Sequence, residues 1–595
     1  MNARIVCAIA LIGLVTGLST SAYGTGRDVL SDTWVATDAL GREVPTYEEV
    51  GPPREDKVVA LFYFTWLGQH SMTGPFNIPE ILAADPDDPP WGPEQHFHHW
   101  GEPEHGYYLS DDEYVIRHHA KTLTDAGVDV LFMDVTNAFT YRNVYMKICE
   151  VFQDIRDNGG RTPQIGFLAH AFSDRVVREL YDDFYSQGLY PELWFMWEGK
   201  PLILAMPEEE DPEMEDFFTI RRSWAWSAAP WFGDGYNAWP WLDHTPQQYG
   251  WVEEGVPEQL PVAVAQHATT NIGRSHHDGQ QPPPEEQRPE LGLYFQEQWE
   301  RALEVDPQVV FITGWNEWVA QRFISDGTAT LAGETVPPGG SYFVDAYTQE
   351  YNRDIEPMKG GHTDSTYYQM VSNIRRFRGA RPQEPITRYH TIEIDGDFAD
   401  WDAVAPTYFD TEGDTFHRDH PGWGEAGPYI NTTGRNDFSE LKVALDEEFV
   451  YFMAQCVEPI TPHTDPNWML LFINADRDAS TGWEGYNYVV NRQVLDERNT
   501  VLRRSLGGWD WEDVGEIAYH VNEHRLELAI PRSMLPDLGE EFEFKWADNI
   551  QADDDITQFN VSGDAAPNGR FNYLVRLKIE DEPDDIAQAP FSCIR

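Results

Sequence analysis

Apolar runs alternate with amphipathic segments along the first two thirds of the chain. Residues 57–64 form an apolar run. Residues 111–126 have the apolar spacing of a helix with one buried face, and the apolar run 129–133 follows. A short apolar run bounded by turn residues is typical of a strand buried on both faces. This region therefore predicts strands that alternate with helices around a parallel sheet.

The alternation continues to about residue 379. The further expected strands are 164–169, 193–197, 202–205, 217–226, 261–266, 309–312 and 341–346, and the further expected helices are 141–158, 174–185, 291–303 and 365–377. A long loop is expected around Trp239 and Trp241. The count approaches eight βα units, which matches an α/β fold of the (β/α)8 TIM-barrel type with long loops after its strands.

The pattern changes at the Pro-rich segment 379–385, beyond which the helical period is largely gone. Apolar and polar residues then alternate over short segments, which are 441–445, 449–455, 468–474, 486–491, 524–530, 541–546 and 570–579. Such segments, with turn residues between them, predict an antiparallel β-sandwich. The expected organisation is a leader 1–24, a lead-in 25–56, a barrel 57–379, a linker 380–388 and a β-sandwich 389–595.

The N-terminus predicts export. Arg4 precedes an apolar run of 14 residues, 5–18, and small residues occupy 19–24. This is the pattern of a signal peptide cleaved after Ala22 or Gly24, and the run is too short to span a bilayer. We therefore expect a secreted or periplasmic protein without membrane insertion. Three of the four cysteines lie beyond the leader, far apart in sequence, which excludes a disulfide scaffold.

Charge narrows the range of partners. The chain has 101 acidic and 42 basic residues, for a net charge of −59. This excess argues against nucleic acid and against anionic membrane surfaces as partners. The chain also has 22 tryptophans at a mean hydropathy of −0.52. Glycan handling is one natural explanation, because an indole offers a flat apolar face to a sugar ring.

The segment 311–318, Phe-Ile-Thr-Gly-Trp-Asn-Glu-Trp, carries the main candidate chemistry. Residues just beyond a barrel strand lie on the face where barrel enzymes act, which places Glu317 there. A carboxylate at that face can exchange a proton or attack an anomeric carbon. Asn316 can bond a hydroxyl, and Trp315 can stack on a sugar. The alternative is a buried glutamate paired with an arginine.

Other polar or aromatic residues follow the remaining predicted strands. Asp134 is the favoured partner acid for Glu317, with Glu198, Asp243 and Asp278 in reserve. The expected substrate-binding residues are Tyr63, Trp66, His170, Trp241, Asp243, His267, Trp315 and Asn316.

Metal and cofactor signals are weak. His96, His98, His99 and His105 crowd one loop but lack zinc-site spacing, which favours solvated or substrate-facing histidines. Asp476 and Asp478 are candidate ligands of a structural Ca²⁺ ion, and they fit a simple turn equally well. No Gly-rich phosphate loop and no serine nucleophile motif occurs. Hydrolysis by carboxylates requires no cofactor.

Residues 57–379 resemble the glycoside hydrolase family 99-like proteins, which include endo-α-mannosidases and WbsX-like polysaccharide proteins. The resemblance rests on the tyrosine and tryptophan after the first strand, on Val130-Leu-Phe-Met-Asp134 after its helix, and on Trp315-Asn-Glu-Trp318. It implies a barrel that acts on glycosidic bonds, with Glu317 aligned to a family catalytic glutamate. The family pattern has a second glutamate three residues later, where this chain has Ala320.

Residues 389–580 resemble family 9-like carbohydrate-binding modules, through the segments 394–401 and 474–486. Such modules bind sugars or act as spacers, and Trp423 and Trp483 are the candidates for sugar stacking. Together the two resemblances imply an exported glycoside hydrolase that cleaves a polysaccharide or glycan internally. The alternative is a non-catalytic glycan-binding protein that kept the barrel and lost an acid, as Ala320 would allow.

Overall fold

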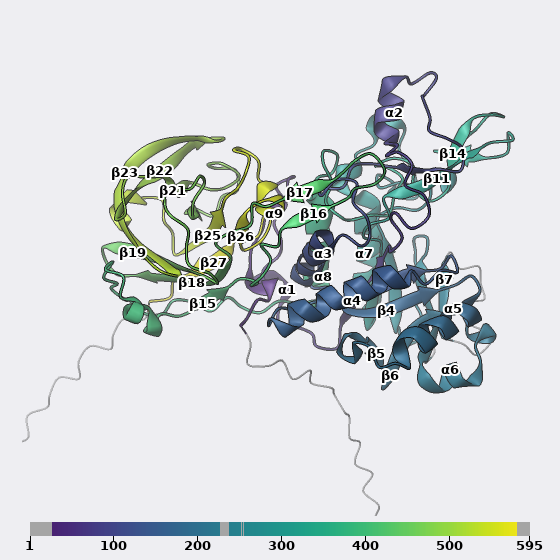
Figure 1. Ribbon diagram of the computed structural model, residues 1–595, viewed down its shortest axis with the longest axis horizontal. Coiled ribbons are helices and arrows are strands. Elements are labelled where there is room, and N and C mark those ends of the chain that lie inside the picture. The colour runs from purple at the N-terminus through teal and green to yellow at the C-terminus, as the bar shows by residue number, and fades with distance from the viewer. Residues whose placement is uncertain (1–26, 226–236, 252, 254, 580–595) are drawn as a thin grey trace, which may run out of the picture.

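The structure is a computed structural model that describes residues 27–225, 237–251, 253 and 255–579. A barrel of parallel strands surrounded by helices occupies its N-terminal part, and a curled antiparallel sheet occupies its C-terminal part (Figure 1). The predicted signal peptide lies outside the described residues. Within those residues, no helix has the length and apolar character needed to cross a bilayer.

Eight parallel strands form the barrel, in the order β8-β7-β6-β4-β3-β1-β10-β9. They are β1 (Val58–Tyr63), β3 (Val130–Val135), β4 (Gln164–Ala169), β6 (Lys200–Ala205), β7 (Thr219–Ala225), β8 (Ala238–Leu242), β9 (Gln259–Ala263) and β10 (Val309–Thr313). The end strands β8 and β9 pack together, and the Gln259 side chain donates a 2.7 Å hydrogen bond to the Pro240 carbonyl across the seam. The barrel is nearly closed, which confirms the predicted fold class.

Two strand assignments from the sequence are wrong. Residues 238–242, expected in a loop, are the barrel strand β8, because Trp239 faces the interior at 0% exposure. The expected last strand instead contributes only β14 (Ser341–Phe343), which pairs with β11 (Val319–Ile324) and through it with β2 (Phe97–His99) in a separate antiparallel sheet. Within 193–197, only β5 (Met196–Trp197) is extended, and it runs antiparallel to β6.

Helices cover the outer face of the barrel sheet. They are α3 (Glu113–Ala126), α4 (Arg142–Asp157), α5 (Ser173–Leu180), α6 (Pro212–Phe217), α7 (Leu293–Val305) and α8 (Ser365–Arg378), with α1 (Tyr47–Val50) and α2 (Ile78–Ala84) before them. The α3 helix begins after Asp112, whose carboxylate accepts a bond from the Tyr114 amide, and ends at Gly127 with φ 85°. These caps explain why its predicted bounds are nearly right.

Alternation along each strand separates two layers of side chains. Phe62 and Phe132 belong to the cluster inside the barrel, whereas Leu61, Tyr63 and Met133 belong to the layer under the helices. Successive side chains of a strand point to opposite faces, so Asp134 follows Phe132 onto the inner face. The strand period therefore decides which predicted residues reach the barrel mouth.

The C-terminal domain is built around one continuous antiparallel sheet, in the order β15-β18-β19-β24-β23-β22-β21-β20-β25-β26, with β27 beside β25. Its strands are β15 (Thr407–Phe409), β18 (Phe438–Leu445), β19 (Phe449–Cys456), β20 (Leu470–Asn474), β21 (Tyr488–Val494), β22 (Asn499–Gly507), β23 (Asp510–Asn522), β24 (Arg525–Pro531), β25 (Glu541–Asp548), β26 (Asp564–Ala566) and β27 (Tyr573–Arg576). The sheet curls until β18 and β26 touch, which encloses a sandwich-like core and confirms the predicted class.

A hairpin of the C-terminal domain reaches the barrel. Its strands, β16 (Arg418–His420) and β17 (Tyr429–Asn431), lie between the two bodies in Figure 1. Arg418 forms a buried 2.7 Å ion pair with Asp112, and the Tyr107 amide donates to the Tyr429 hydroxyl. The lead-in also crosses over, through a β-bridge between Val35 and Asn572. The domain bounds stay a prediction, because these contacts make the two parts one packed unit.

Candidate functional site

Glu317 lies just beyond β10, and its backbone is held on two sides. Its amide donates a 2.8 Å hydrogen bond to Asp354 Oδ1, and its carbonyl accepts from the Trp100 indole at 3.0 Å. The neighbouring Asn316 side chain bonds the backbone N–H and carbonyl of Phe64 at 2.9 and 3.2 Å, which ties the loop after β10 to the loop after β1. The Glu317 side chain is 14% exposed. Its position is therefore determined by the surrounding structure.

Arg353 contacts Glu317 directly. Its Nη2 atom lies 2.9 Å from Glu317 Oε2 and 3.6 Å from Asp345 Oδ1, and the arginine side chain is 5% exposed. Glu317 is thus paired with an arginine, which is the alternative that the sequence left open. The pair does not by itself exclude proton transfer, because Arg353 is shared with other acids.

Burial and neighbouring carboxylates raise the pKa of Glu317. Burial raises the pKa well above its usual range, and the carboxylates of Asp345, Asp354 and Asp134 raise it further, against the opposing effect of Arg353. One guanidinium in contact with several carboxylates cannot hold all of them ionised at low cost. Glu317 is therefore suited to carry a proton near neutral pH.

Asp134 ends β3 on the inner face of the barrel, with 4% exposure. Its carboxylate accepts hydrogen bonds from the Trp66 indole at 3.0 Å and from the Thr136 amide and hydroxyl at 2.9 and 2.7 Å. Burial raises the pKa of Asp134, whereas these three donors lower it. Only β1 separates β3 from β10, and the Asp134 charge acts on Glu317, so the structure brings the two predicted carboxylates together.

A buried polar network supports the loop that carries Glu317. Glu356 accepts a hydrogen bond from the Tyr108 hydroxyl at 2.7 Å and another from the Trp318 indole, and its Oε1 atom lies 2.9 Å from His119 Nε2. The other ring nitrogen of His119 lies 2.8 Å from the Tyr63 hydroxyl. These bonds position Trp318 beneath the mouth.

Two predicted sugar-contacting residues occupy the outer layer. Tyr63 is 4% exposed and bonded to His119, because the strand period turns it away from the barrel interior. Trp315 is fully buried beside His119 and Tyr367. The Asn316 side chain is 1% exposed, and its amide group is hydrogen-bonded to the Phe64 backbone. In this structure these three side chains support the site from behind.

The other predicted substrate-binding residues lie at the same end of the barrel. Trp66 is half-buried and bonded to Asp134, and Trp241 stacks on Phe62 with ring centroids 5.6 Å apart. His170 is exposed after β4, and His267 Nε2 lies 3.3 Å from Asp345 Oδ1.

Asp243 and the reserve acids differ in position. The Asp243 carboxylate accepts from the amides of His244 and Gln248, which stabilises the loop after β8. Glu198 precedes β6, so it lies at the opposite end of the barrel, where it pairs with Arg221. That position rules it out as a partner for Glu317. Asp278 is exposed in a turn after β9.

Ala320 lies in β11 opposite His98 and is 4% exposed. The position that holds an acid in the resembled family is therefore a packed strand position here. Of the four loop histidines, expected to be solvated or substrate-facing, His98, His99 and His105 are not solvated, at 0%, 1% and 6% exposure, whereas His96 is half-buried. Rings of Phe76, Trp423 and His118 cover the three buried histidines.

The charged segment 350–356 was missed by sequence reasoning. It supplies Arg353, Asp354 and Glu356, all at most 5% exposed and all in contact with the loop of Glu317. The available signal was Asn352-Arg-Asp-Ile-Glu356, a dense run of charges with no helical or strand period. Charges in such a run are usually solvated, which is why it did not stand out.

The predicted ligand and stacking residues of the C-terminal domain have other partners. Asp476 accepts from Thr481 and Asn487, and Asp478 accepts from the amide and hydroxyl of Ser480, as in a turn. Calcium binding there stays a prediction. Trp423 and Trp483 are 1% and 3% exposed, so neither indole face is open to a sugar as the sequence had predicted.

No family model and no curated protein matches the sequence. Among solved structures, the barrel region is similar to the GH99 endo-alpha-mannosidase from Bacteroides thetaiotaomicron. One structure of it aligns with a TM-score of 0.31 and 17% identity over 55% of this chain and 99% of that one. A second, in complex with BIS-TRIS-propane, aligns with a TM-score of 0.29 and 13% identity over 54% of this chain and 97% of that one.

The C-terminal region is similar to a family 9 carbohydrate-binding module from Caldicellulosiruptor kristjanssonii, solved in complex with glucose. The TM-score is 0.20 and the identity 14%, over 33% of this chain and 97% of that one. The likenesses fall on the two regions where the sequence shows its two family resemblances. At these scores they carry no inference about activity, and the fold stands on the strand pairing described above.

Proposed function

We propose that this protein is an exported glycoside hydrolase that cleaves a polysaccharide or glycan internally, with the C-terminal sheet as an accessory domain. The observation that carries the proposal is the placement of two buried carboxylates, Glu317 and Asp134, at one end of a parallel barrel. Glycosidic hydrolysis requires two carboxyl groups of this kind, and burial raises the pKa of both, that of Glu317 well above its usual range.

The surroundings of the two acids favour different roles. Glu317, whose pKa is raised by burial and by three neighbouring carboxylates, acts as the general acid that protonates the leaving oxygen. Asp134, whose pKa is raised by burial against the effect of three hydrogen-bond donors that favour its ionised form, acts as base or nucleophile. In this assignment Arg353 orients the Glu317 carboxyl group.

Aromatic side chains at the same end support a sugar substrate. Trp66 and Trp241 are half-buried, and each is fixed by a neighbour, Trp66 by Asp134 and Trp241 by the Phe62 ring. A fixed indole offers an apolar face to a pyranose ring at a low entropic cost. The net charge of −59 favours a neutral or cationic glycan over a polyanionic one in low salt, by simple repulsion.

The competing function is a non-catalytic glycan-binding protein. Two observations favour it, namely the arginine paired with Glu317 and the packed alanine at position 320. Under this alternative Arg353 and the four neighbouring acids would bind sugar hydroxyls without transferring a proton. These acids are Glu317, Asp134, Asp345 and Asp354.

Release of reducing ends from a panel of marine and plant polysaccharides tests the proposal. Internal cleavage predicts a rapid fall in polymer size with few reducing ends at first. If the protein binds a glycan tightly and releases no reducing ends from it at any pH between 4 and 9, the binding function replaces the hydrolase.

A further inference from the structure

Four aspartates of the C-terminal domain converge beside the barrel. Asp410 and Asp414 lie in the loop after β15, Asp437 precedes β18, and Asp564 begins β26. Asp410, Asp414 and Asp564 each offer one carboxylate oxygen, and these three oxygens lie within 4.8 Å of one another. Asp410 is fully buried and Asp564 is 5% exposed. The loops of the sheet therefore concentrate negative charge where water has little access.

Several oxygens of this cluster have no partner. Within the described residues, both carboxylate oxygens of Asp410 and the Oδ1 atoms of Asp414 and Asp437 are buried and accept no hydrogen bond. Buried carboxylate oxygens are almost always paired or bound to a metal, because desolvating an unpaired charge is expensive. Asp410 is thus a buried acceptor for which the described part of the chain supplies no donor.

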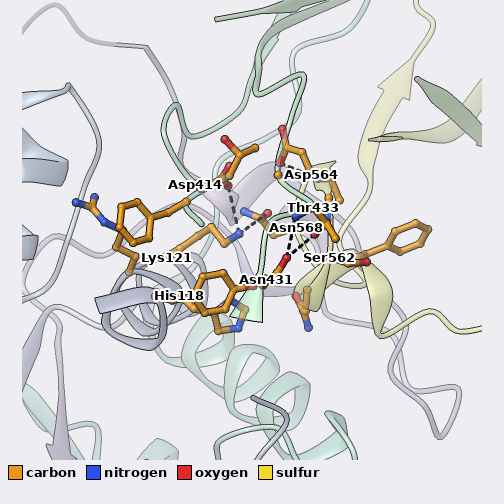
Figure 2. A pocket seen from close by; sticks show the side chains of 17 residues that line it. His118, Lys121, Asp414, Asn431, Thr433, Ser562, Asp564 and Asn568 are labelled. Atoms are coloured by element: carbon orange, nitrogen blue, oxygen red, sulfur yellow. Dashed lines mark hydrogen bonds and ion pairs between the residues drawn. The ribbon is translucent and has the colours of Figure 1, made fainter. Parts of the chain in front are cut away.

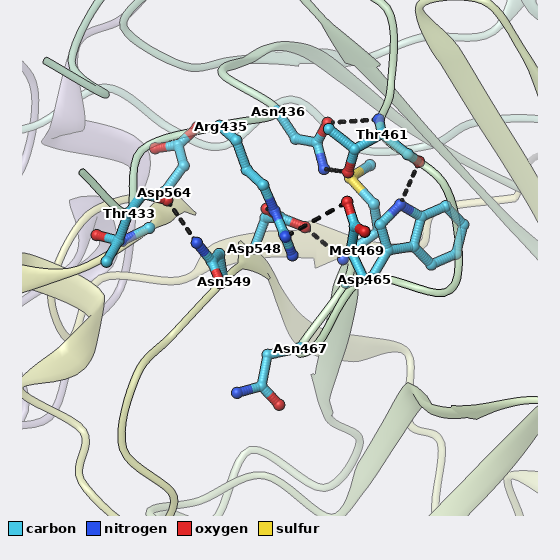
Figure 3. Close-up of polar contacts among 12 residues, drawn as sticks. Thr433, Arg435, Asn436, Thr461, Asp465, Asn467, Met469, Asp548, Asn549 and Asp564 are labelled. Carbon is cyan, nitrogen blue, oxygen red and sulfur yellow. Dashed lines mark hydrogen bonds and ion pairs between the residues drawn. The ribbon is translucent and has the colours of Figure 1, made fainter. Parts of the chain in front are cut away.

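The same domain shows how a buried aspartate is satisfied by protein alone. Asp548 is also fully buried, but Arg435 donates to its Oδ2 at 2.6 Å and the Met469 amide donates to its Oδ1 at 2.8 Å (Figure 3). Neither kind of donor reaches Asp410. The contrast within one domain makes the unpartnered carboxylate a specific feature of this cluster.

Within the described residues, Lys121 is in ion-pair contact with the cluster, and the charges of Arg27 and Lys545 also act on Asp410. Lys121 of α3 lies 3.2 Å from Asp414 Oδ2 and bonds Asn568 Oδ1 at 3.0 Å (Figure 2). This contact uses the outer oxygen of Asp414 and leaves its Oδ1 free. None of these cations bonds an oxygen of Asp410, so the cluster keeps buried acceptors that are unpaired.

We propose that Asp410, Asp414, Asp437 and Asp564 bind one Ca²⁺ ion at the junction of the two domains. All the converging groups are oxygen donors, the preference of a hard cation, and no cysteine or histidine takes part. Ligand oxygens 2.3–2.6 Å from Ca²⁺ lie at most about 5 Å apart, which fits the 4.8 Å spread of the Asp410, Asp414 and Asp564 oxygens. Irregular loops with several carboxylates suit Ca²⁺ better than Mg²⁺, which demands a near-ideal octahedron and keeps its waters.

The position gives the ion a route and a structural role. A cavity of about 390 Å³, lined by Asp414, Asp437 and Lys121 among others, lies beside the cluster and provides an entry path. Lys121 and Asp125 belong to α3 of the barrel, so a bound ion would fix the loop 410–414 against that helix. Calcium then stabilises the contact between barrel and sheet.

The test uses the full chain, stripped with EDTA and titrated with CaCl₂ at pH 7.5. We expect one Ca²⁺ per chain after dialysis, and a rise in the melting temperature of roughly 2 °C at a hundredfold excess over Kd, because the ion binds only the folded form. At a free calcium concentration equal to the wild-type Kd, the Asp410→Asn variant should bind less than a tenth of the calcium that the wild type binds. In EDTA it should melt at or above the wild-type temperature, because one buried unpaired charge has been removed.

The matched control is Asp478→Asn, in an exposed turn of the same domain, which should keep the full calcium response. Retained calcium binding in Asp410→Asn together with its loss in Asp478→Asn would move the site to that turn and overturn the proposal. If Ca²⁺ does not change the melting temperature of the stripped wild-type protein, the proposal is also overturned. Protons and Lys121 would then be what offsets the negative charge of the aspartates. For any variant that melts irreversibly, Tb³⁺ luminescence measures ion binding at the same site in place of the melting temperature.

Discussion

Replacing Arg353 with methionine should destabilise the protein strongly, and more so as the pH rises. The guanidinium lies 2.9 Å from Glu317, and both side chains are largely buried. At an effective dielectric constant of about 20, an ion pair at this distance is worth about 6 kcal/mol before desolvation. Leaving one partner of a buried pair uncompensated typically costs about 3–5 kcal/mol. We expect a loss in that range at pH 8.

The pH dependence follows from the direction of the pKa change. Loss of Arg353 removes the largest interaction that lowers the pKa of Glu317, so this folded-state pKa rises further above the unfolded value. An acid whose pKa is raised on folding costs stability that is absent below its unfolded pKa and grows as the pH rises toward its folded pKa. Each additional unit of pKa costs about 1.4 kcal/mol at high pH. The variant should therefore approach wild-type stability near pH 4.

Urea unfolding at pH 4, 6 and 8 measures this effect. Arg288→Met is the matched control, because Arg288 is 61% exposed and its ion pair with Glu290 is worth at most about 1 kcal/mol. A loss below about 1 kcal/mol for Arg353→Met at pH 8, or a loss that does not change with pH, would refute the account of the charges around Glu317.

Three further predictions follow from the geometry. Asp134→Asn should lower turnover by about 10²–10⁴ with the melting temperature nearly unchanged; a rate within threefold of wild type would remove Asp134 from the chemistry. Ala320→Glu should lower the melting temperature without raising activity, because position 320 is packed in β11; a stable and faster variant would show that the position can hold an acid. Arg418→Met should cost about 3–5 kcal/mol in urea unfolding, because Asp112 is left buried and unpaired; a loss below about 1 kcal/mol would show that the hairpin contact contributes little.

Much of the fold was predictable because the barrel strands are long apolar runs. The runs 164–169 and 309–312 match β4 and β10 almost residue for residue. The strand β8 was missed because its sequence, Ala-Trp-Pro-Trp-Leu, carries a proline and two tryptophans that also suit a loop. In the sheet domain β22 and β23 were missed, because charged residues occupy their exposed faces and hide the alternation.

The site was predictable only in part. Asp134 and Glu317 were identified because each follows a predicted strand, and the C-terminal ends of barrel strands form the face where barrel enzymes act. Which face a side chain takes depends on the register within the strand, and Tyr63 falls on the outer face for that reason. Arg353 reaches Glu317, 36 positions earlier in the chain, and Asp410 reaches Asp564 only through tertiary folding. Spacing along the chain carries no signal for either contact.

Glu317→Gln is the most direct test of the proposed hydrolase. The measurement is kcat at several pH values on a polysaccharide that the wild-type protein cleaves, with the fold checked by thermal unfolding. We predict a loss of at least about 10²-fold, and for the wild type a fall in rate as the pH rises through the raised pKa of the Glu317 acid. Turnover near the wild-type value in Glu317→Gln, with the same pH profile, would contradict the assignment of Glu317 as the acid.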